Sequence, residues 1–203
     1  MAIQLFKIWD GSWKNIVKPY YWNGSSWVAC NKKIAVWEDG WVTVWQPDPN
    51  IEYRRPTTST QTGVFDTRSE DFSGNGSYSY YNTAANLNRT GSSTLLGFSN
   101  GTQTYTNLTL KADSVGASCS DGSALPSSVG IVLSTDGGSS FPTTLFSANS
   151  SGVSINLLSG NGYSLSTGQT ISNIQVKVSV TAGRIGGDAQ LSFSNLRTEG
   201  TYY

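Results

Sequence analysis

The chain has 203 residues, 13 basic and 13 acidic side chains, and no histidine. The zero net charge leaves no basic stripe to neutralise a phosphate backbone, and no apolar run is long enough to span a membrane, so we expect neither nucleic-acid binding nor a membrane span. Ser, Thr, Asn and Gly make up 89 of the residues. Because these residues favour turns over helix interiors, the composition predicts an all-β protein.

All the tryptophans fall in the first 45 residues: Trp9, Trp13, Trp22, Trp27, Trp37, Trp41 and Trp45. They belong to a threefold repeat, read as Trp-Asp-Gly-Ser-Trp at 9–13, Trp-Asn-Gly-Ser-Ser-Trp at 22–27 and Trp-Glu-Asp-Gly-Trp at 37–41. Asp-Gly and Asn-Gly accept positive φ angles and are strong hairpin signals. The repeat therefore predicts three small β-hairpins over residues 1–45, each with two tryptophans meeting across its ladder.

Hairpins of this size bury little apolar surface on their own, and small units usually need an outside staple. The chain offers these hairpins no metal site and no disulfide framework. We therefore predict that the seven tryptophans form an anchor, covered by a neighbouring copy, the rest of the chain or a larger assembly. Tryptophan also stacks on sugar rings, so glycan binding is the alternative for the same residues.

A proline-rich and threonine-rich stretch follows the repeats. Pro47, Pro49 and Pro56 lie within ten residues and interrupt strand pairing, which predicts a linker over 46–63. Residues 64–203 then read as a second module.

The residue pattern of this second module, 64–203, predicts a jelly-roll-like β-sandwich. Its clearest strand is 174–181, where Ile and Val alternate with polar residues, and 106–112 repeats that pattern. Shorter strand candidates, separated by Gly-rich turns, lie at 95–98, 130–133, 153–157, 163–165 and 191–193. Many short strands joined by such turns are typical of sandwiches and jelly rolls.

One turn in this module has a recognisable pattern. Ser134, Asp136, Gly138 and Phe141 resemble a single Asp-box hairpin, the Ser-x-Asp-x-Gly-x-x-Trp/Phe turn of sialidase-type propellers. The resemblance implies that the aspartate accepts backbone N–H groups across the turn and that the aromatic ring covers the hairpin base. A propeller would repeat the box in every blade, so we expect this single copy to be a structural turn.

Catalytic chemistry has few candidates in this sequence. Without histidine there is no Ser-His-Asp or Cys-His arrangement and no imidazole ligand for zinc. The only adjacent acidic pair of residues 64–203, Glu70-Asp71, would point to opposite faces of a strand, and the spaced carboxylates of a calcium loop are absent. We therefore expect no enzymatic activity, no metal and no cofactor.

The Trp-Asp-Gly-Ser-Trp-Lys, Trp-Asn-Gly-Ser-Ser-Trp-Val and Trp-Glu-Asp-Gly-Trp-Val series, over residues 5–45, resembles the short repeats of tailed-bacteriophage virion proteins. The segment 162–176 resembles part of β-sandwich domains in phage and bacterial surface proteins, with Ser166-Thr167 and Asn173 where Pro and Gly are common. These resemblances imply a virion structural protein of the tail, baseplate, neck or head decoration.

Several expectations follow from the resemblance. The partners would be other virion proteins, the chain would be a homo-oligomer within the particle, and it would be assembled in the host bacterial cytoplasm. The start of the chain lacks the charged and apolar regions of a signal peptide, which agrees with that location. The alternative is an adhesin that reads host surface glycan, and an enzyme that cuts surface polysaccharide is a third hypothesis.

Overall fold

The computed structural model describes residues 7–9, 13–15, 19–30, 34–37, 41–45, 48–83, 89–98, 104–121, 126–167 and 173–202. These form two compact units, which are described separately: residues 1–50 with 202–203, and residues 51–201. Within the described ranges the regular elements are β-strands and there is no α-helix. The prediction of an all-β protein is confirmed.

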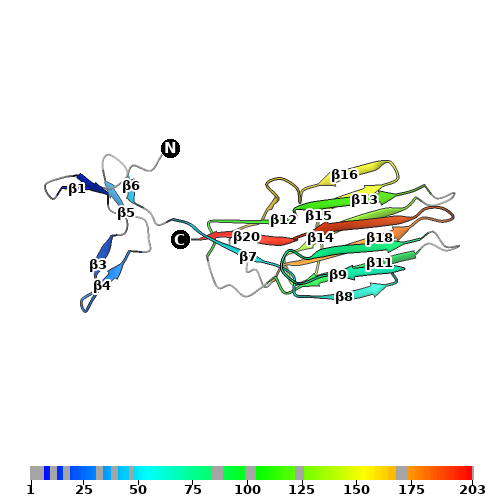
Figure 1. Cartoon of the computed structure of the whole chain (residues 1–203), viewed down its shortest axis with the longest axis horizontal. Coiled ribbons are helices and arrows are strands. Elements are labelled where there is room, and N and C mark those ends of the chain that lie inside the picture. Colours follow the sequence, from blue (N-terminus) through cyan, green and yellow to red (C-terminus); the bar gives the residue numbers. More distant parts are fainter. Residues whose placement is uncertain are drawn as a thin grey trace. The chain divides into compact units, whose positions relative to one another are not determined.

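The smaller unit contains three separate two-stranded antiparallel ladders (Figure 1). They pair β1 (Lys7–Trp9) with β2 (Trp13–Asn15), β3 (Tyr20–Trp22) with β4 (Trp27–Ala29), and β5 (Ile34–Trp37) with β6 (Trp41–Trp45). Each ladder spans one sequence repeat. The turn residues of the first and third repeats, Asp10-Gly11 and Asp39-Gly40, lie outside the described residues.

The larger unit is built from three antiparallel sheets. The six-stranded sheet has the order β16-β15-β14-β18-β11-β8. Its strands are β8 (Thr58–Gly63), β11 (Arg89–Leu96), β14 (Ser128–Ser134), β15 (Thr143–Asn149), β16 (Gly152–Asn156) and β18 (Gln175–Ala182).

The two remaining sheets have four strands each. One has the order β13-β19-β10-β9 and consists of β9 (Thr67–Glu70), β10 (Ser77–Asn82), β13 (Ser114–Cys119) and β19 (Ala189–Ser194). The other has the order β17-β12-β20-β7 and consists of β7 (Asn50–Arg54), β12 (Asn107–Lys111), β17 (Tyr163–Ser164) and β20 (Arg197–Tyr202).

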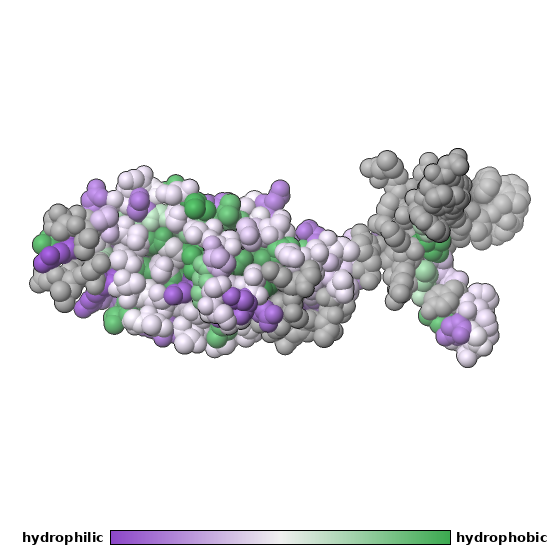
Figure 2. All heavy atoms as spheres, turned by 180° about the vertical axis from the view of Figure 1, so that it is seen from behind, coloured by the Kyte–Doolittle hydropathy of each residue, from purple (hydrophilic) through white to green (hydrophobic). Residues whose placement is uncertain are grey.

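The six-stranded sheet packs face to face against the β13-β19-β10-β9 sheet, which makes the larger unit a β-sandwich. Along β18, Val176, Val178 and Val180 are buried and alternate with partly exposed polar residues, as the period-two pattern predicts. In the facing sheet the buried Tyr78 lies directly opposite Phe193, and the two rings stack with centroids 4.9 Å apart. Aliphatic and aromatic side chains therefore fill the space between the sheets. The face of this unit seen in Figure 2 is mostly pale, the colour of residues of intermediate hydropathy.

A kinked ribbon joins the sandwich to the third sheet. β12 pairs with β20 in the third sheet, and the strands that adjoin them in sequence, β13 and β19, pair in the sandwich. The chain bends between these pairs, after Lys111 and after Ser194. The bend requires a φ angle of +48° at Asn195, a conformation that Asn tolerates better than most residues. The sheets therefore share one long antiparallel ribbon that changes direction at Asn195.

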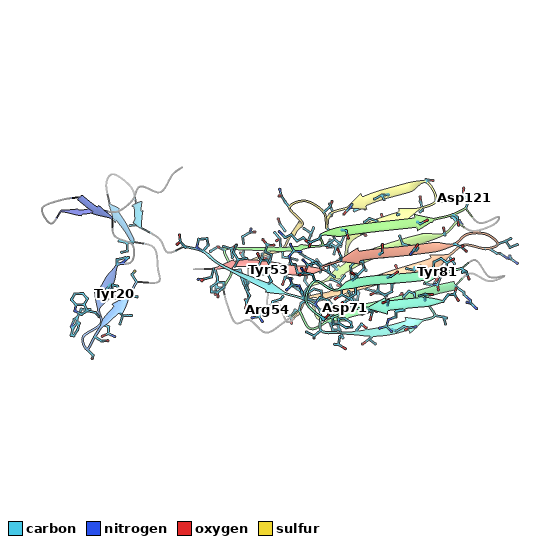
Figure 3. All side chains as sticks on the ribbon, viewed as in Figure 1. Tyr20, Tyr53, Arg54, Asp71, Tyr81 and Asp121 are labelled. Carbon is cyan, nitrogen blue, oxygen red and sulfur yellow. The ribbon has the colours of Figure 1, made fainter. Side chains whose placement is uncertain are left out.

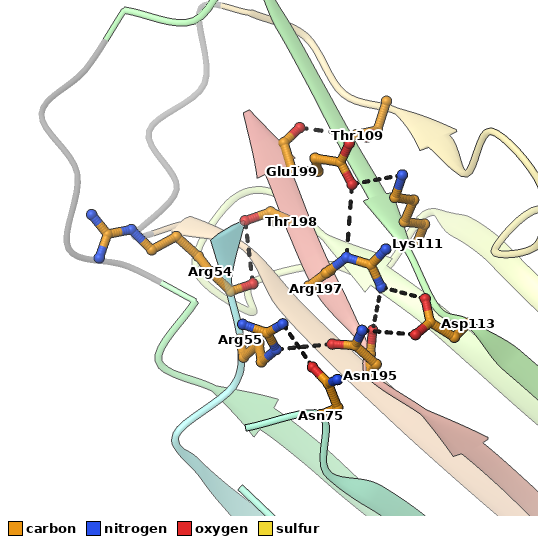
Figure 4. Close-up of polar contacts among 10 residues, drawn as sticks. All are labelled: Arg54, Arg55, Asn75, Thr109, Lys111, Asp113, Asn195, Arg197, Thr198 and Glu199. Atoms are coloured by element: carbon orange, nitrogen blue, oxygen red, sulfur yellow. Dashed lines mark hydrogen bonds and ion pairs between the residues drawn. The ribbon is translucent and has the colours of Figure 1, made fainter. Parts of the chain in front are cut away.

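Polar contacts fix this bend (Figure 4). The Asn195 side chain accepts a hydrogen bond from Arg55 Nε at 2.9 Å and donates one to Asp113 Oδ2 at 2.8 Å. Its backbone N–H donates to the Gly76 carbonyl, and its carbonyl accepts from Arg197 Nη1, which also binds Asp113 Oδ1 at 2.7 Å. The charges of Asp113 and Arg197 are therefore paired with each other within the fold.

The linker predicted over 46–63 is wrong for most of its length. Residues 50–54 form β7 and residues 58–63 form β8, which pairs along its length with β11. Pro56 is buried in the connection between the two strands, where its missing N–H removes no ladder hydrogen bond. The larger unit therefore begins near Ile51 and not at residue 64.

Candidate functional site

The ladder registers bring the tryptophans of each repeat together. Trp9 lies opposite Trp13, Trp22 opposite Trp27, and Trp37 opposite Trp41, while Trp45 lies opposite Ile34. Among the seven, only Trp22 and Trp27 have described side chains. The repeat thus places two tryptophans in register at the turn end of each ladder.

The β3–β4 hairpin is held in shape by its turn. The Asn23 side-chain oxygen accepts the backbone N–H groups of Ser25 at 3.0 Å and Ser26 at 2.9 Å, and the Asn23 N–H donates to the Ser26 carbonyl at 3.1 Å. Gly24 supplies the φ of +98° that this turn needs. The Asn-Gly pair therefore makes the turn rigid through the hydrogen bonds that this residue type forms with nearby backbone.

This hairpin presents an exposed aromatic face. Trp22 and Trp27 are 54% and 68% exposed, and their rings meet edge to face with centroids 5.8 Å apart. Tyr20, two residues before Trp22 and so on the same side of the strand, is 59% exposed and is labelled in Figure 3. Residues 19–31 contain no charged side chain. This uncharged, exposed aromatic cluster is therefore the candidate interaction surface of the described residues.

The Asp-box-like turn lies between β14 and β15. The Asp136 carboxylate accepts hydrogen bonds from the Ser134 hydroxyl at 2.6 Å, from the Ser140 backbone N–H at 3.0 Å and from the Ser140 hydroxyl at 2.6 Å. The Ser134 oxygen in turn accepts the Gly138 N–H at 2.8 Å. These bonds, that from Ser134 foremost, hold the pKa of Asp136 below its ordinary value.

Phe141 follows this turn, and Lys177 Nζ lies 5.6 Å from the centroid of its ring. The carboxylate of Asp136 is thus engaged by the turn itself, and the aromatic ring contacts a neighbouring strand. This geometry supports the interpretation of the four residues as a structural hairpin.

A second polar cluster, which sequence reasoning did not find, centres on Glu70. One carboxylate oxygen accepts the hydroxyls of Tyr80 at 2.7 Å and Ser93 at 2.5 Å, and the other accepts Ser59 Oγ at 2.5 Å and Arg68 Nη2 at 2.6 Å. Ser59 and Ser93 belong to the six-stranded sheet, whereas Arg68 and Tyr80 belong to the facing one. Glu70 therefore ties the two sheets together at the β8–β9 edge.

We call Glu70 and its partners Ser59, Arg68, Tyr80 and Ser93 the Glu70 clasp. The electrostatics of this clasp keep Glu70 ionised. Burial of its side chain, which is 6% exposed, opposes ionisation, but the hydrogen bonds from Arg68 and the three hydroxyls outweigh that effect and lower the pKa to about 2. Beside it is a shallow depression lined by Thr57, Thr58, Ser59, Arg68, Glu70 and Phe72. A carboxylate with this pKa and with both oxygens occupied is poorly suited to general acid or base chemistry near neutral pH.

In the described ranges, no group of three or more His, Cys, Asp or Glu side chains is placed to hold a metal ion. No described helix has the length and apolar character required to cross a membrane.

No family model matches this chain, and neither a curated protein nor a solved structure does.

Proposed function

We propose that this chain is a non-enzymatic structural protein of a bacteriophage virion, docked on the particle through its N-terminal tryptophan hairpins. In this proposal the sandwich of residues 51–201 is the displayed body. The tail, the baseplate, a neck appendage and the head surface are all compatible positions for it. The resemblance of the repeats to those of phage virion proteins supports a virus particle as the assembly. The exposed aromatic face is the proposed docking surface on that particle.

The observation that carries the proposal is the exposure of Tyr20, Trp22 and Trp27 on one uncharged hairpin. Burying a large apolar side chain contributes roughly 2–3 kcal/mol. A partner surface that covers these three solvent-exposed rings would therefore bind with a substantial gain in free energy. Aromatic residues are also enriched in the buried centres of interfaces. The threefold repeat multiplies this gain, because hairpins on one chain bind a repeated surface with avidity.

Two features of the larger unit support a non-enzymatic role. Its core is closed by its own buried side chains, so it needs no partner to fold. The buried carboxylate of Glu70 is committed to joining the two sheets.

Replacing Trp22 and Trp27 together with alanine should lower incorporation into particles by on the order of tenfold or more, because both indoles lose their burial against the particle. The measurement is the number of copies per purified particle, by quantitative mass spectrometry. Ile185→Ala is the matched control, since Ile185 is 60% exposed but belongs to the larger unit. Wild-type occupancy of the double variant would refute docking through this hairpin.

Glycan recognition is the alternative that the same aromatic face favours, because exposed rings stack on sugars. The chain offers a clean test: all seven tryptophans lie before residue 46, so tryptophan emission reports on the smaller unit alone. We expect no change in emission when host polysaccharide is titrated into the intact protein. A saturable change that disappears in Trp22→Ala would instead favour the adhesin.

A further inference from the structure

The turn of the β3–β4 hairpin combines an Asn-Gly pair with free space around its backbone. Asn23, Gly24, Ser25 and Ser26 are all exposed, and a Cβ atom at Gly24 would meet no atom within 4 Å. Within the described residues the Gly24 N–H donates no hydrogen bond, whereas the N–H groups of Ser25 and Ser26 both do. The Gly24 nitrogen is therefore open to solvent and to its neighbouring side chain.

The Asn23 side chain folds back across Gly24. Its Oδ1 accepts the backbone N–H groups of Ser25 at 3.0 Å and Ser26 at 2.9 Å, which both follow Gly24 in the chain. A bond between Asn23 Cγ and the Gly24 nitrogen would close a five-membered ring and place negative charge on Oδ1. Donors that already point at an oxygen where charge develops stabilise the transition state. The turn thus supplies an oxyanion hole to its own asparagine.

We propose that Asn23 is a site of spontaneous deamidation, at which this turn modifies its own backbone. A solvent base removes the Gly24 amide proton, and the nitrogen forms a bond with Asn23 Cγ. The Cγ–Nδ2 bond breaks, and the nitrogen leaves as ammonia with a proton from solvent. Water then opens the cyclic imide at either of its carbonyls, so the products are aspartate and isoaspartate. The reaction consumes only water and needs only a base.

Asn161 provides a comparison within the same chain, because it too is exposed and precedes a glycine. Here the Gly162 N–H donates to the Ser159 carbonyl at 3.2 Å, so the nitrogen is engaged. A Cβ atom at Gly162 would lie 2.6 Å from Lys111 Cβ, which shows that this backbone has little free space. Attack by the Gly162 nitrogen must first break its hydrogen bond.

Asn75 is restrained in another way. Its Oδ1 accepts Arg55 Nη2 at 3.0 Å, and the Asn195 N–H donates to the Gly76 carbonyl at 2.9 Å (Figure 4 shows the side chains). Gly76 is buried, and a Cβ atom there would overlap the Asp71 carbonyl oxygen. Ring closure requires the peptide between Asn75 and Gly76 to rotate, and this packing opposes the rotation.

The two products have different effects on the aromatic face. Isoaspartate adds a methylene to the main chain between Trp22 and Trp27, so these in-register residues cannot keep their present edge-to-face contact. Aspartate leaves the main chain unchanged, and it is the residue that precedes glycine in the other two repeats, at Asp10 and Asp39. Isoaspartate is therefore the disruptive product, whatever partner this face binds.

The test is to incubate the folded, full-length protein at mildly alkaline pH. Peptide mass spectrometry with fragmentation follows the conversion of amide to acid at each asparagine, and isoaspartyl methyltransferase measures the isoaspartate. We expect Asn23 to react on the order of tenfold faster than Asn161 or Asn75, because breaking one hydrogen bond before attack slows a reaction by about that factor.

The same protein in concentrated guanidinium chloride is the control. Each of these asparagines then precedes glycine in an unfolded chain, so their rates should converge. Asn23 should react faster in the folded protein than in denaturant, because the Ser25 and Ser26 N–H groups act on Oδ1 only in the hairpin. Asn23→Gln, which would need a six-membered ring, should remove the fast reaction. The proposal is overturned if Asn161 or Asn75 keeps pace with Asn23 in the folded protein, or if folding does not accelerate Asn23.

Discussion

Glu70→Ala should lower the free energy of unfolding of the larger unit by about 3–5 kcal/mol, the range found when one partner of a buried polar cluster is removed. The substitution leaves the Tyr80 and Ser93 hydroxyls without their acceptor between the sheets and leaves Arg68 without its ion pair. Chemical denaturation followed by far-UV circular dichroism measures the change.

Two variants separate this effect from a generic loss of charge. Glu70→Gln keeps the shape and one acceptor oxygen, so we expect an intermediate loss. Asp71→Asn removes the neighbouring carboxylate, which is exposed and accepts hydrogen bonds from the nearby Ser73, so its effect should be small. Equal stability of the Glu70→Ala and Asp71→Asn chains would show that the clasp contributes nothing.

The clasp also predicts a pH dependence. The pKa of Glu70 is about 2 in the folded protein against an ordinary value of 4.5, so unfolding raises its proton affinity. Its stabilisation is therefore complete above about pH 4.5 and is lost as the pH falls toward 2. We expect the stability difference between wild type and Glu70→Gln to shrink over this interval, measured by thermal unfolding at each pH. A difference that stays constant or grows would contradict this assignment.

Gly200→Ala should destabilise the larger unit by about 1–3 kcal/mol, the usual cost of overpacking a core. A Cβ atom at Gly200 would lie 2.3 Å from the ring of Tyr105, and Tyr105 is only 3% exposed, so its ring has little room to move away. Thermal unfolding monitored by circular dichroism measures the change.

Gly116→Ala provides the matched control within another strand. There the added Cβ would meet only Ser192 Oγ, at an ordinary contact distance of 3.6 Å. Alanine at such a site restricts the unfolded chain, so we expect little change or a slight gain in stability. Equal destabilisation by Gly116→Ala and Gly200→Ala would mean that strand position, and not the Tyr105 ring, sets the cost.

The strands that the sequence predicted are those with apolar alternation. β18 and β12 have a buried Val or Leu at every second position, and this period of two decides which face is inward. Turn signals were equally informative: Gly137 and Gly138 adopt φ angles of +74° and +89° in the predicted turn after β14.

Two of the strands that sequence reasoning missed are polar. β8 reads Thr-Ser-Thr-Gln-Thr-Gly and β20 reads Arg-Thr-Glu-Gly-Thr-Tyr, and neither has an apolar stripe to set its period. β8 is an edge strand that pairs with β11 through its backbone, so its side chains remain free to be polar. Backbone pairing with a distant strand leaves no local pattern, and this is why residues 46–63 resembled a linker.

The Glu70 clasp was hidden for a related reason. Its four partners come from four strands, and they lie up to 23 positions from Glu70 in the sequence, Ser93 on β11 being the farthest. Adjacent charges such as Glu70-Asp71 can be read from a sequence, but a carboxylate surrounded by serine and tyrosine hydroxyls becomes visible only once the two sheets are placed face to face. The tryptophan cluster was visible because its hairpins are local.

The pairing of early with late strands has a consequence for synthesis on the ribosome. β10 pairs with β19, β11 with β18, and β12 with β20, so each early strand waits for a partner about a hundred residues away. The short ladders of the smaller unit close between neighbouring residues and can form as they emerge. A nascent chain that stalls before β18 therefore leaves one edge of β11 unpaired, since only β8 has been made to pair with it. Such a species is prone to aggregate, so the last strands to be translated protect the first ones of the sandwich.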